Sequence, residues 1–182
     1  MIVGLIPARL NSKRLKYKPL IKIEGLPLII HVMKRAMLSK KLDDLIVCAD
    51  DISIVECVKK FGGKSILTSK KFRNGTERIA HVLANYKKIK YVVDIQCDEL
   101  FLNPKHLDLL ITNFTQKKNL DLIIPHNLSS KYNDKNYVKL VTNKENEVIY
   151  LSRHDIPFSK DKIKLKKHLD FIIFKRNALL KY

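Results

Sequence analysis

Cationic side chains are concentrated near the N-terminus, directly after the first apolar run of the chain. The apolar run covers residues 2–6 and is bounded by Pro7, and the segment from Arg9 to Lys18 then carries five cations and Ser12. Open α/β sheets bind their ligands at the carboxyl ends of parallel strands. A loop with five positive charges at that position favours an anion, in particular a polyphosphate held by side chains. The alternative is a solvated basic loop in a lysine-rich chain.

Two further polar segments accompany later apolar runs, and one of them supplies a carboxylate. Residues 91–96 lead into Cys97-Asp98-Glu99, and the polar residues 74–78 lead into a helical pattern. Mg²⁺ in nucleotide sites takes few protein carboxylates and fills its other positions with phosphate oxygens and water. A cationic loop opposite a carboxylate therefore predicts a nucleotide bound with Mg²⁺, with Asp98 as the metal ligand. The alternative is that Asp98 caps a helix or forms an ion pair.

The spacing of apolar residues predicts that strands and helices alternate over the first 125 residues. Short apolar runs bounded by turn residues are typical of buried strands, and apolar residues spaced by three and four are typical of amphipathic helices. The predicted strands cover residues 2–6, 45–49, 65–68, 91–96 and 120–125. The predicted helices cover residues 28–38, 52–60, 79–86 and 104–114, and one of Asp50 and Asp51 is expected to cap the second. This order predicts an α/β fold with a doubly wound, mostly parallel, Rossmann-like sheet.

The last part of the chain departs from this alternation. Strands predicted over residues 137–142 and 147–151 flank the hairpin signal Asn143-Lys144-Glu145-Asn146, and a last strand is predicted over residues 169–174. No linker is long enough to divide domains, so a single nucleotide-binding domain is expected over residues 1–182. A homodimer through residues 137–151 is also expected, because the hairpin has more apolar residues than a small exposed hairpin leaves in water. The alternative is that these residues pack within the chain; they are Tyr137, Leu140, Val148 and Tyr150.

Short motifs along the whole chain resemble one enzyme family. The first runs from Ile6 to Leu20 as Ile-Pro-Ala-Arg-x-x-Ser-x-Arg-Leu-x-x-Lys-Pro-Leu. Seven more follow in order: Ala49-Asp50-Asp51, Phe61-Gly62-Gly63, Gly75-Thr76-Glu77-Arg78-Ile79-Ala80, Gln96-x-Asp98-Glu99, Asn136-x-Val138-Lys139-Leu140-Val141, Tyr150-x-Ser152-Arg153-x-x-Ile156-Pro157 and His168-Leu169. The sequence is similar to the CMP-sugar synthetases, and most of all to the 3-deoxy-manno-octulosonate cytidylyltransferases. That family has a nucleotide-diphospho-sugar transferase-like fold.

The resemblance implies nucleotidyl transfer. CMP would pass from CTP to the anomeric hydroxyl of 3-deoxy-manno-octulosonate (Kdo) or a related ulosonic acid, with Mg²⁺ as cofactor and release of pyrophosphate, for lipopolysaccharide or surface polysaccharide biosynthesis. The residues implied in catalysis are Lys18, Arg78 and Asp98, with Asp98 as the metal ligand. Those implied in nucleotide binding are Arg9, Ser12, Arg14, Lys18, Gly75, Thr76 and Arg78. Those implied in binding the sugar acid are Gln96, Arg153 and His168.

The sequence also departs from the family pattern. Lys16-Tyr17 stands where the family has Pro-Gly, and beside Asp98 the residues Cys97 and Leu100 stand where the family has glycine and proline. The family continues beyond the position of Tyr182 and supplies a second metal-binding aspartate there. We therefore expect a chain that is truncated relative to the family. The alternative to an active cytidylyltransferase is a homologue that binds CTP without useful turnover.

Composition and charge restrict the other classes of function. Lys and Arg number 36 and Asp and Glu 18, and the resulting net charge of +18 permits nucleic acid as a partner. The basic residues are mostly lysines spread along the chain without a nucleic-acid-binding motif, so a basic nucleic-acid-binding domain is the less favoured alternative. The three cysteines show no metal-binding spacing, and no apolar stretch has the length of a signal peptide or membrane span. A cytoplasmic protein without membrane insertion is expected.

Overall fold

The computed structural model describes residues 1–11, 15–117 and 119–181, and it divides the chain into two compact units. Unit 1 combines residues 1–123 with the segment that begins at Phe171, and unit 2 covers residues 124–170. No helix within the described ranges has both the length and the apolar character needed to cross a membrane. Unit 1 contains the alternating strands and helices that the sequence predicts, and unit 2 contains the predicted hairpin.

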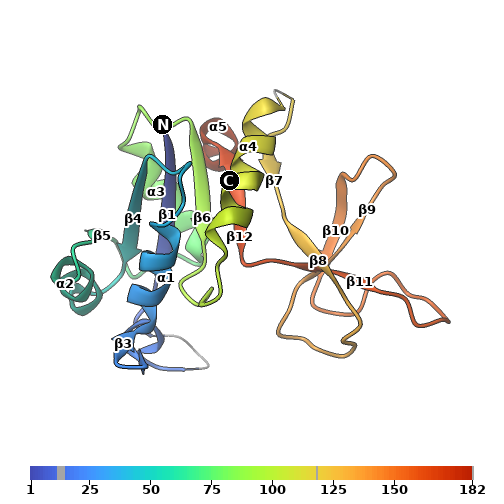
Figure 1. The fold of residues 1–182 in the computed structure, drawn as a ribbon, viewed down its shortest axis with the longest axis horizontal. Coiled ribbons are helices and arrows are strands. Elements are labelled where there is room, and N and C mark those ends of the chain that lie inside the picture. The colour runs from blue at the N-terminus through green and yellow to red at the C-terminus, as the bar shows by residue number, and fades with distance from the viewer. Residues whose placement is uncertain (12–14, 118, 182) are drawn as a thin grey trace. The chain divides into compact units, whose positions relative to one another are not determined.

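Unit 1 is built on a sheet with the strand order β5-β4-β1-β6-β12-β7 (Figure 1). Four neighbouring strands are parallel: β5 (Lys64–Leu67), β4 (Asp44–Ala49), β1 (Ile2–Ala8) and β6 (Tyr91–Ile95). β12 (Phe171–Lys175) runs antiparallel to β6, and the two-residue strand β7 (Leu122–Ile123) forms the edge. The prediction of a mostly parallel α/β sheet is confirmed, and the four parallel strands end at one edge of it.

Helices cover both faces of this sheet, with α1 in front of it and α3 behind it in Figure 1. They are α1 (Leu28–Ala36), α2 (Ile52–Lys60), α3 (Gly75–Ala84), α4 (Pro104–Gln116) and α5 (Arg176–Leu180). On one face, Val3 and Leu5 of β1 pack against Ile79 of α3. A β-carbon at Gly4 would lie 2.4 Å from Leu45 Cδ1, so β1 is closely packed there as well. This two-sided covering is the doubly wound arrangement that the sequence predicts.

Side-chain caps define the starts of α2 and α4. The Asp51 carboxylate accepts a hydrogen bond from the Ser53 backbone N–H (3.1 Å), as expected for one of the two neighbouring aspartates. Asn103 accepts a hydrogen bond from the Lys105 N–H (3.0 Å). Pro104 occupies the first turn of α4, where a backbone N–H would have no partner within the helix, so its missing N–H costs no hydrogen bond. Both starts agree with the sequence-based prediction.

The start of α3 differs from the prediction. The helix begins at Gly75, four residues before the predicted start, because the Asn74 side chain accepts a hydrogen bond from the Glu77 N–H (2.8 Å). Thr76 and Arg78 therefore lie in the first turn of a helix and not in a loop.

β1 continues through Pro7, although the sequence predicted that the strand would end there. Its pairing with β6 covers only Ile2 to Leu5, whereas its pairing with β4 continues to Ala8. Pro7 lies beyond the part of β1 that is paired on both sides, so its missing N–H interrupts no pairing with β6.

Unit 2 is an antiparallel sheet with the strand order β10-β9-β11-β8. Its strands are β8 (His126–Ser129), β9 (Lys139–Thr142), β10 (Val148–Ser152) and β11 (Leu165–His168). β9 and β10 form the predicted hairpin, in which the Asn143 N–H donates to the Glu147 carbonyl (3.0 Å) and Asn146 has φ 62°. No strand was predicted at β11, because Leu165 is followed by three polar residues.

The apolar residues of the hairpin are divided between the interior and the surface of unit 2. Leu140 is 1% exposed, so the expectation that it contributes to a dimer contact is wrong and it packs within the chain. Tyr150 is 62% exposed and its neighbour Ile149 is 65% exposed. Both lie on β10, an edge strand whose only pairing in the described sheet is with β9.

Candidate active site

The basic segment after β1 and the acidic loop after β6 meet at the carboxyl edge of the unit 1 sheet. Lys18 opens the short 3₁₀ helix η1 (Lys18–Leu20), and its ammonium group forms an ion pair with the Asp98 carboxylate. The side chains are 25% and 38% exposed, so both groups are accessible to a ligand. Asp98 is thus ion-paired, which the sequence analysis gave as an alternative to metal binding. Its partner is a cation of the segment that is predicted to bind phosphate.

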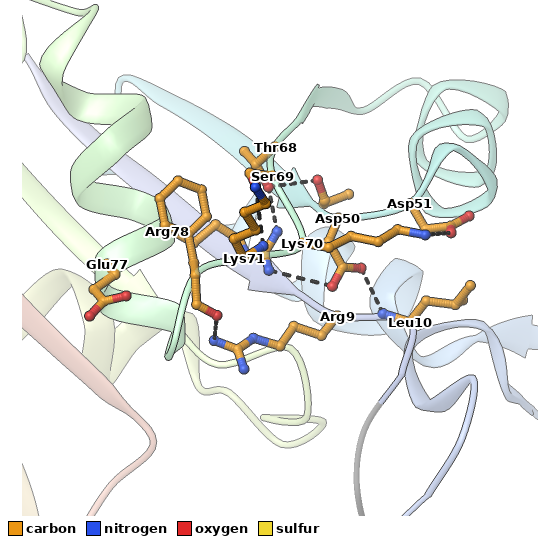
Figure 2. A network of polar contacts seen from close by, with 12 residues as sticks. Arg9, Leu10, Asp50, Asp51, Thr68, Ser69, Lys70, Lys71, Glu77 and Arg78 are labelled. Atoms are coloured by element: carbon orange, nitrogen blue, oxygen red, sulfur yellow. Dashed lines mark hydrogen bonds and ion pairs between the residues drawn. The ribbon is translucent and has the colours of Figure 1, made fainter.

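Asp50 links the basic segment to the interior of unit 1 (Figure 2). Its Oδ1 accepts a hydrogen bond from the Leu10 backbone N–H (2.9 Å), and its Oδ2 lies 3.4 Å from Arg78 Nη2. Asp50 is 9% exposed and follows β4, whereas Leu10 belongs to the segment after β1 and Arg78 to α3. One buried carboxylate therefore fixes the first residues of the basic segment against α3.

Arg78 is fully buried, with 0% of its side chain exposed. Its Nη1 donates to the Thr68 hydroxyl, and its guanidinium lies 5.7 Å from the centre of the Phe72 ring. Burial lowers the pKa of Arg78 below its ordinary value, although the Asp50 carboxylate acts in the opposite direction. Among the described residues, Arg78 Nε has no hydrogen-bond partner. This guanidinium belongs to the internal framework of the site, and the prediction that it borders the nucleotide stays a prediction.

Arg9 directly follows β1 and lies at the same edge of the sheet. Its Nη2 donates to the Phe72 carbonyl (2.9 Å), which ties the start of the basic segment to the loop before α3. Ser12 and Arg14 of the basic segment are also implied in nucleotide binding, and they lie outside the described residues. The basic segment is therefore fixed at its start by Arg9 and Leu10 and near its end by Lys18.

The first turn of α3 and the end of β6 share a buried carboxylate that sequence reasoning did not select. Asp94 is 1% exposed, and it accepts hydrogen bonds from the Thr76 hydroxyl (3.4 Å) and from Gln96 Nε2 (2.9 Å). Burial raises its pKa to about 7. A β-carbon at Gly75 would lie 2.9 Å from Pro7 Cγ, so the helix start is packed tightly against β1. The signal in the sequence was a single aspartate inside an otherwise apolar run.

The residues implied in sugar binding are divided between the two units, with Gln96 in unit 1 and Arg153 and His168 in unit 2. Arg153 Nη1 donates to the carbonyls of Lys135 (3.0 Å) and Asn136 (2.9 Å). Burial lowers the pKa of His168 to about 4, so its ring is neutral at pH 7. Its Nε2 is buried without a partner among the described residues. The buried Nε2 has no accessible surface for a ligand in this structure, so the assignment of His168 to the sugar acid stays a prediction.

Unit 2 also contains a buried cation to which sequence reasoning assigned no role. Lys139 is 3% exposed, and its ammonium group lies 3.3 Å from Asp155 Oδ1 and donates to the Arg153 carbonyl (3.0 Å). These contacts hold the Arg153 backbone against β9. The sequence signal was a lysine between two apolar residues of a predicted strand.

The described residues are compatible with Mg²⁺ at Asp98 but do not form a complete metal site. In residues 1–11, 15–117 and 119–181 there is no group of three or more His, Cys, Asp or Glu side chains placed to hold a metal ion. Mg²⁺ in nucleotide sites often has one or two protein carboxylates, and phosphates and water supply the rest. A partly exposed Asp98 next to Lys18 fits that donor set.

The fold and this site define a class of enzyme. The sequence matches the cytidylyltransferase family over residues 3–180. The chain therefore belongs to the cytidylyltransferases, as the resemblance of its motifs indicates.

Its relatives identify a more particular group. The chain is 40% identical over 185 residues to the 3-deoxy-manno-octulosonate cytidylyltransferase of Fusobacterium nucleatum, covering 99% of this chain and 75% of that protein. It is 36% identical over 187 residues to the enzyme of the same name from Chlamydia pneumoniae, covering 100% of this chain and 74% of that protein. A solved CMP:2-keto-3-deoxy-manno-octonic acid synthetase in complex with CTP superposes with a TM-score of 0.92 at 30% identity, covering 100% of this chain and 76% of that one.

Proposed function

We propose that this protein is a CTP:Kdo cytidylyltransferase. The observation that carries the proposal is the pairing of Lys18 with Asp98 at the carboxyl edge of the sheet, in a chain that shares 40% identity with a 3-deoxy-manno-octulosonate cytidylyltransferase. In the reaction, the anomeric oxygen of Kdo attacks the α-phosphorus of CTP in line. A new P–O bond forms as the bond to the bridging oxygen breaks, pyrophosphate leaves, and the hydroxyl proton passes to solvent. The product serves lipopolysaccharide or surface polysaccharide biosynthesis.

The geometry supports distinct roles for the residues of unit 1. The Lys18 ammonium would bind the triphosphate with Arg9, Ser12 and Arg14, and Gly75 and Thr76 would border the nucleotide. Arg78 would position the site without contacting the substrate. Its buried contacts with Asp50 and Thr68 hold the start of α3 and the basic segment together. Gln96, Arg153 and His168, which the family resemblance implies in sugar binding, stay the proposed contacts of the sugar acid.

Asp98 would hold Mg²⁺ together with phosphate oxygens and water. The bound ion would stabilise the negative charge that develops on the phosphates during transfer. In that arrangement Asp98 would bind the cation and the Lys18 ammonium would bind a phosphate oxygen, in place of the ion pair that the two side chains form with each other here.

A pyrophosphate-release assay tests the proposed function. We expect release that requires CTP, Mg²⁺ and Kdo together, and a panel of related ulosonic acids identifies the preferred sugar. CTP binding that depends on Mg²⁺ without pyrophosphate release would select the non-catalytic alternative. Steeply salt-dependent nucleic-acid binding that CTP does not affect would select the nucleic-acid-binding alternative.

Lys18→Ala is expected to weaken CTP binding by about 1–3 kcal/mol, the scale of a hydrogen bond to a charged group. This is a net loss of binding free energy. The wild type has to break the Lys18–Asp98 ion pair before Lys18 binds the nucleotide, whereas the variant has no such pair to break. Isothermal titration calorimetry measures the affinity. Lys22→Ala is the matched control, since it removes an equal charge from an exposed position a few residues along the chain. Equal CTP affinity in wild type and Lys18→Ala would remove Lys18 from this role.

Asp98→Asn is expected to abolish the effect of Mg²⁺ on CTP binding. The amide has the shape of the carboxylate but not its charge, so the cation loses the carboxylate ligand that the proposal assigns to it. Calorimetric CTP titrations with and without Mg²⁺ give the two affinities. Asp121→Asn, at an exposed position in the same unit, should leave the Mg²⁺ effect intact. A Mg²⁺ effect of unchanged size in Asp98→Asn would contradict the assignment.

We also propose a cytoplasmic homodimer. All three cysteines are free thiols, which is usual in a reducing compartment. The partner surface would be β10, where Val148, Ile149, Tyr150 and Leu151 are all exposed. A second copy that pairs along this edge strand would cover those side chains and its free backbone groups.

The dimer has a direct test in Ile149→Lys. A buried lysine in the contact has to be desolvated, so we expect the variant to be monomeric at micromolar concentrations at which the wild type is dimeric. Multi-angle light scattering gives the masses. Leu128→Lys is the control, because Leu128 is 58% exposed on β8, the opposite edge of the same sheet. A monomeric wild type, or a dimer that resists Ile149→Lys, would exclude this surface.

A further inference from the structure

We propose that Asp94 is a positioning residue that fixes the orientation of the Gln96 amide and so determines which chemical group Gln96 recognises. The inference rests on the proposed function. Asp94 would hold the NH₂ end of the amide, so that the carbonyl oxygen is the end presented to the substrate. Gln96 would then recognise a hydroxyl group of the sugar and not its carboxylate.

Asp94 has the surroundings of a group that acts through its neighbours. It lies on β6 between two paired strands, in register with Leu5 of β1 and Ile172 of β12, and it is 1% exposed. No substrate can reach a carboxylate at that depth. Its two hydrogen bonds lead outward, to the Thr76 hydroxyl on α3 and to Gln96 Nε2 just beyond the strand end.

The chemistry of the pair explains the orientation of the amide when Asp94 is ionised. An ionised carboxylate has acceptors only, whereas the Gln side chain has an acceptor oxygen at one end and an NH₂ donor at the other. The buried carboxylate therefore binds the NH₂ end, which lies 2.9 Å from Asp94 Oδ1. Gln96 is only partly buried, so the carbonyl end remains available to a ligand.

An amide oxygen selects its ligand by hydrogen-bonding type. It accepts a hydrogen bond from a hydroxyl but repels a carboxylate or phosphate oxygen. The sugar carries both hydroxyl groups and a carboxylate, and an amide free to rotate could bind either. Because Asp94 holds the NH₂ end, the exposed end of Gln96 can bind only a hydrogen-bond donor of the sugar. The carboxylate of the sugar would then bind to cationic side chains elsewhere.

The test is a double-mutant cycle on Asp94 and Gln96, with KM for Kdo, KM for CTP and kcat measured at pH 8.5, where Asp94 is ionised. Asp94→Leu removes the acceptor and leaves the Gln96 amide free to rotate. We expect the KM for Kdo to rise about tenfold, the scale of one hydrogen bond, and by a larger factor than the KM for CTP, because Asp94→Leu also removes the acceptor of the Thr76 hydroxyl. In the Gln96→Met background, Asp94→Leu should have no further effect on the KM for Kdo, because the amide through which it acts on the sugar is gone.

Asp94→Asn is the conservative rescue. Its Oδ1 can accept from Gln96 Nε2 while its NH₂ donates to the Thr76 hydroxyl oxygen, so we expect a KM for Kdo within twofold of the wild type. A purely structural role would make the effects of Asp94→Leu and Gln96→Met additive, and additive effects would overturn the inference.

Further outcomes separate the inference from the proposed function. If Asp94→Leu does not fold, as judged by circular dichroism, Gln96→Met alone decides, and an unchanged KM for Kdo in that variant overturns the inference. A rise in the KM for CTP in place of that for Kdo would show that the amide serves the nucleotide, which also overturns it. Absence of Kdo-dependent pyrophosphate release in the wild type would instead overturn the proposed function and the inference together.

Discussion

Asp50→Ala is expected to lower the free energy of unfolding by about 3–5 kcal/mol, the usual consequence of removing one partner from a buried ion pair. The reason is that Arg78 is fully buried and would keep its charge without a carboxylate beside it. The Leu10 N–H would lose its acceptor in the same variant. Burial already lowers the pKa of Arg78, which shows how poorly its surroundings solvate the charge.

The neighbouring aspartate provides a matched control. Asp51 caps α2 through its hydrogen bonds with Ser53, and its own ion pair is with Lys70, whose side chain is 68% exposed. Asp51→Ala should therefore cause a much smaller loss of stability than Asp50→Ala, although the two residues are adjacent. Urea unfolding followed by far-UV circular dichroism suits this chain, which contains no Trp. Similar losses in the two variants would show that the Asp50–Arg78 pair has no special weight.

A double variant separates the pair from the packing around it. Asp50→Leu combined with Arg78→Met replaces both charges by apolar side chains, and such replacements of buried ion pairs are often close to neutral. We expect the double variant to recover most of the stability that Asp50→Ala loses. If CTP affinity nevertheless falls, the pair serves to position the basic segment, because the hydrogen bond to the Leu10 N–H is absent in the stable double variant.

Most of the unit 1 fold could be predicted because its signals are local. Apolar runs and caps mark the strands and helices, and alternation of the two restricts the sheet to a mostly parallel order. β11 escaped prediction because Lys166 and Lys167 carry no apolar signal. They are strand residues through pairing with β8 and β9, and the Lys167 ammonium lies over the Tyr137 ring. Such pairings depend on segments far away in the sequence.

The accessible part of the site was easier to predict than its supports. Lys18 and Asp98 have the residue types that phosphate and Mg²⁺ require, and they follow adjacent parallel strands, so the sequence alone indicates that they meet. Asp50 and Asp94 could not be ranked in this way. Their importance comes from burial and from partners on α3 that are distant in the sequence. Asp50 pairs with Arg78, 28 residues away, and Asp94 accepts a hydrogen bond from Thr76, 18 residues away. Sequence spacing does not reveal which aspartate a fold encloses.

The pH dependence of stability should reveal the enclosed carboxyl group of Asp94. Its pKa is about 7 in the folded protein, against an ordinary value near 3.9 in an unfolded chain. Between these values the folded protein holds a proton that the unfolded chain has lost. The Asp94 contribution therefore reduces stability as pH rises from about 4 to about 7, and the full cost remains at higher pH. A difference of about three pKa units corresponds to roughly 4 kcal/mol.

Asp94→Asn removes this cost, because an amide does not ionise and can keep both hydrogen bonds. We expect the variant to exceed the wild type by roughly 4 kcal/mol in the free energy of unfolding at pH 8.5, and to match it within about 1 kcal/mol at pH 4.5. Comparing variant with wild type at each pH cancels the opposite contribution of His168, whose lowered pKa of about 4 reduces stability as pH falls below about 6.5. Asp121→Asn, at an exposed position, should show no such difference. A gain of the same size at both pH values would mean that the pKa of Asp94 is the same in the folded and the unfolded chain, and the effect of the substitution would then come from packing alone.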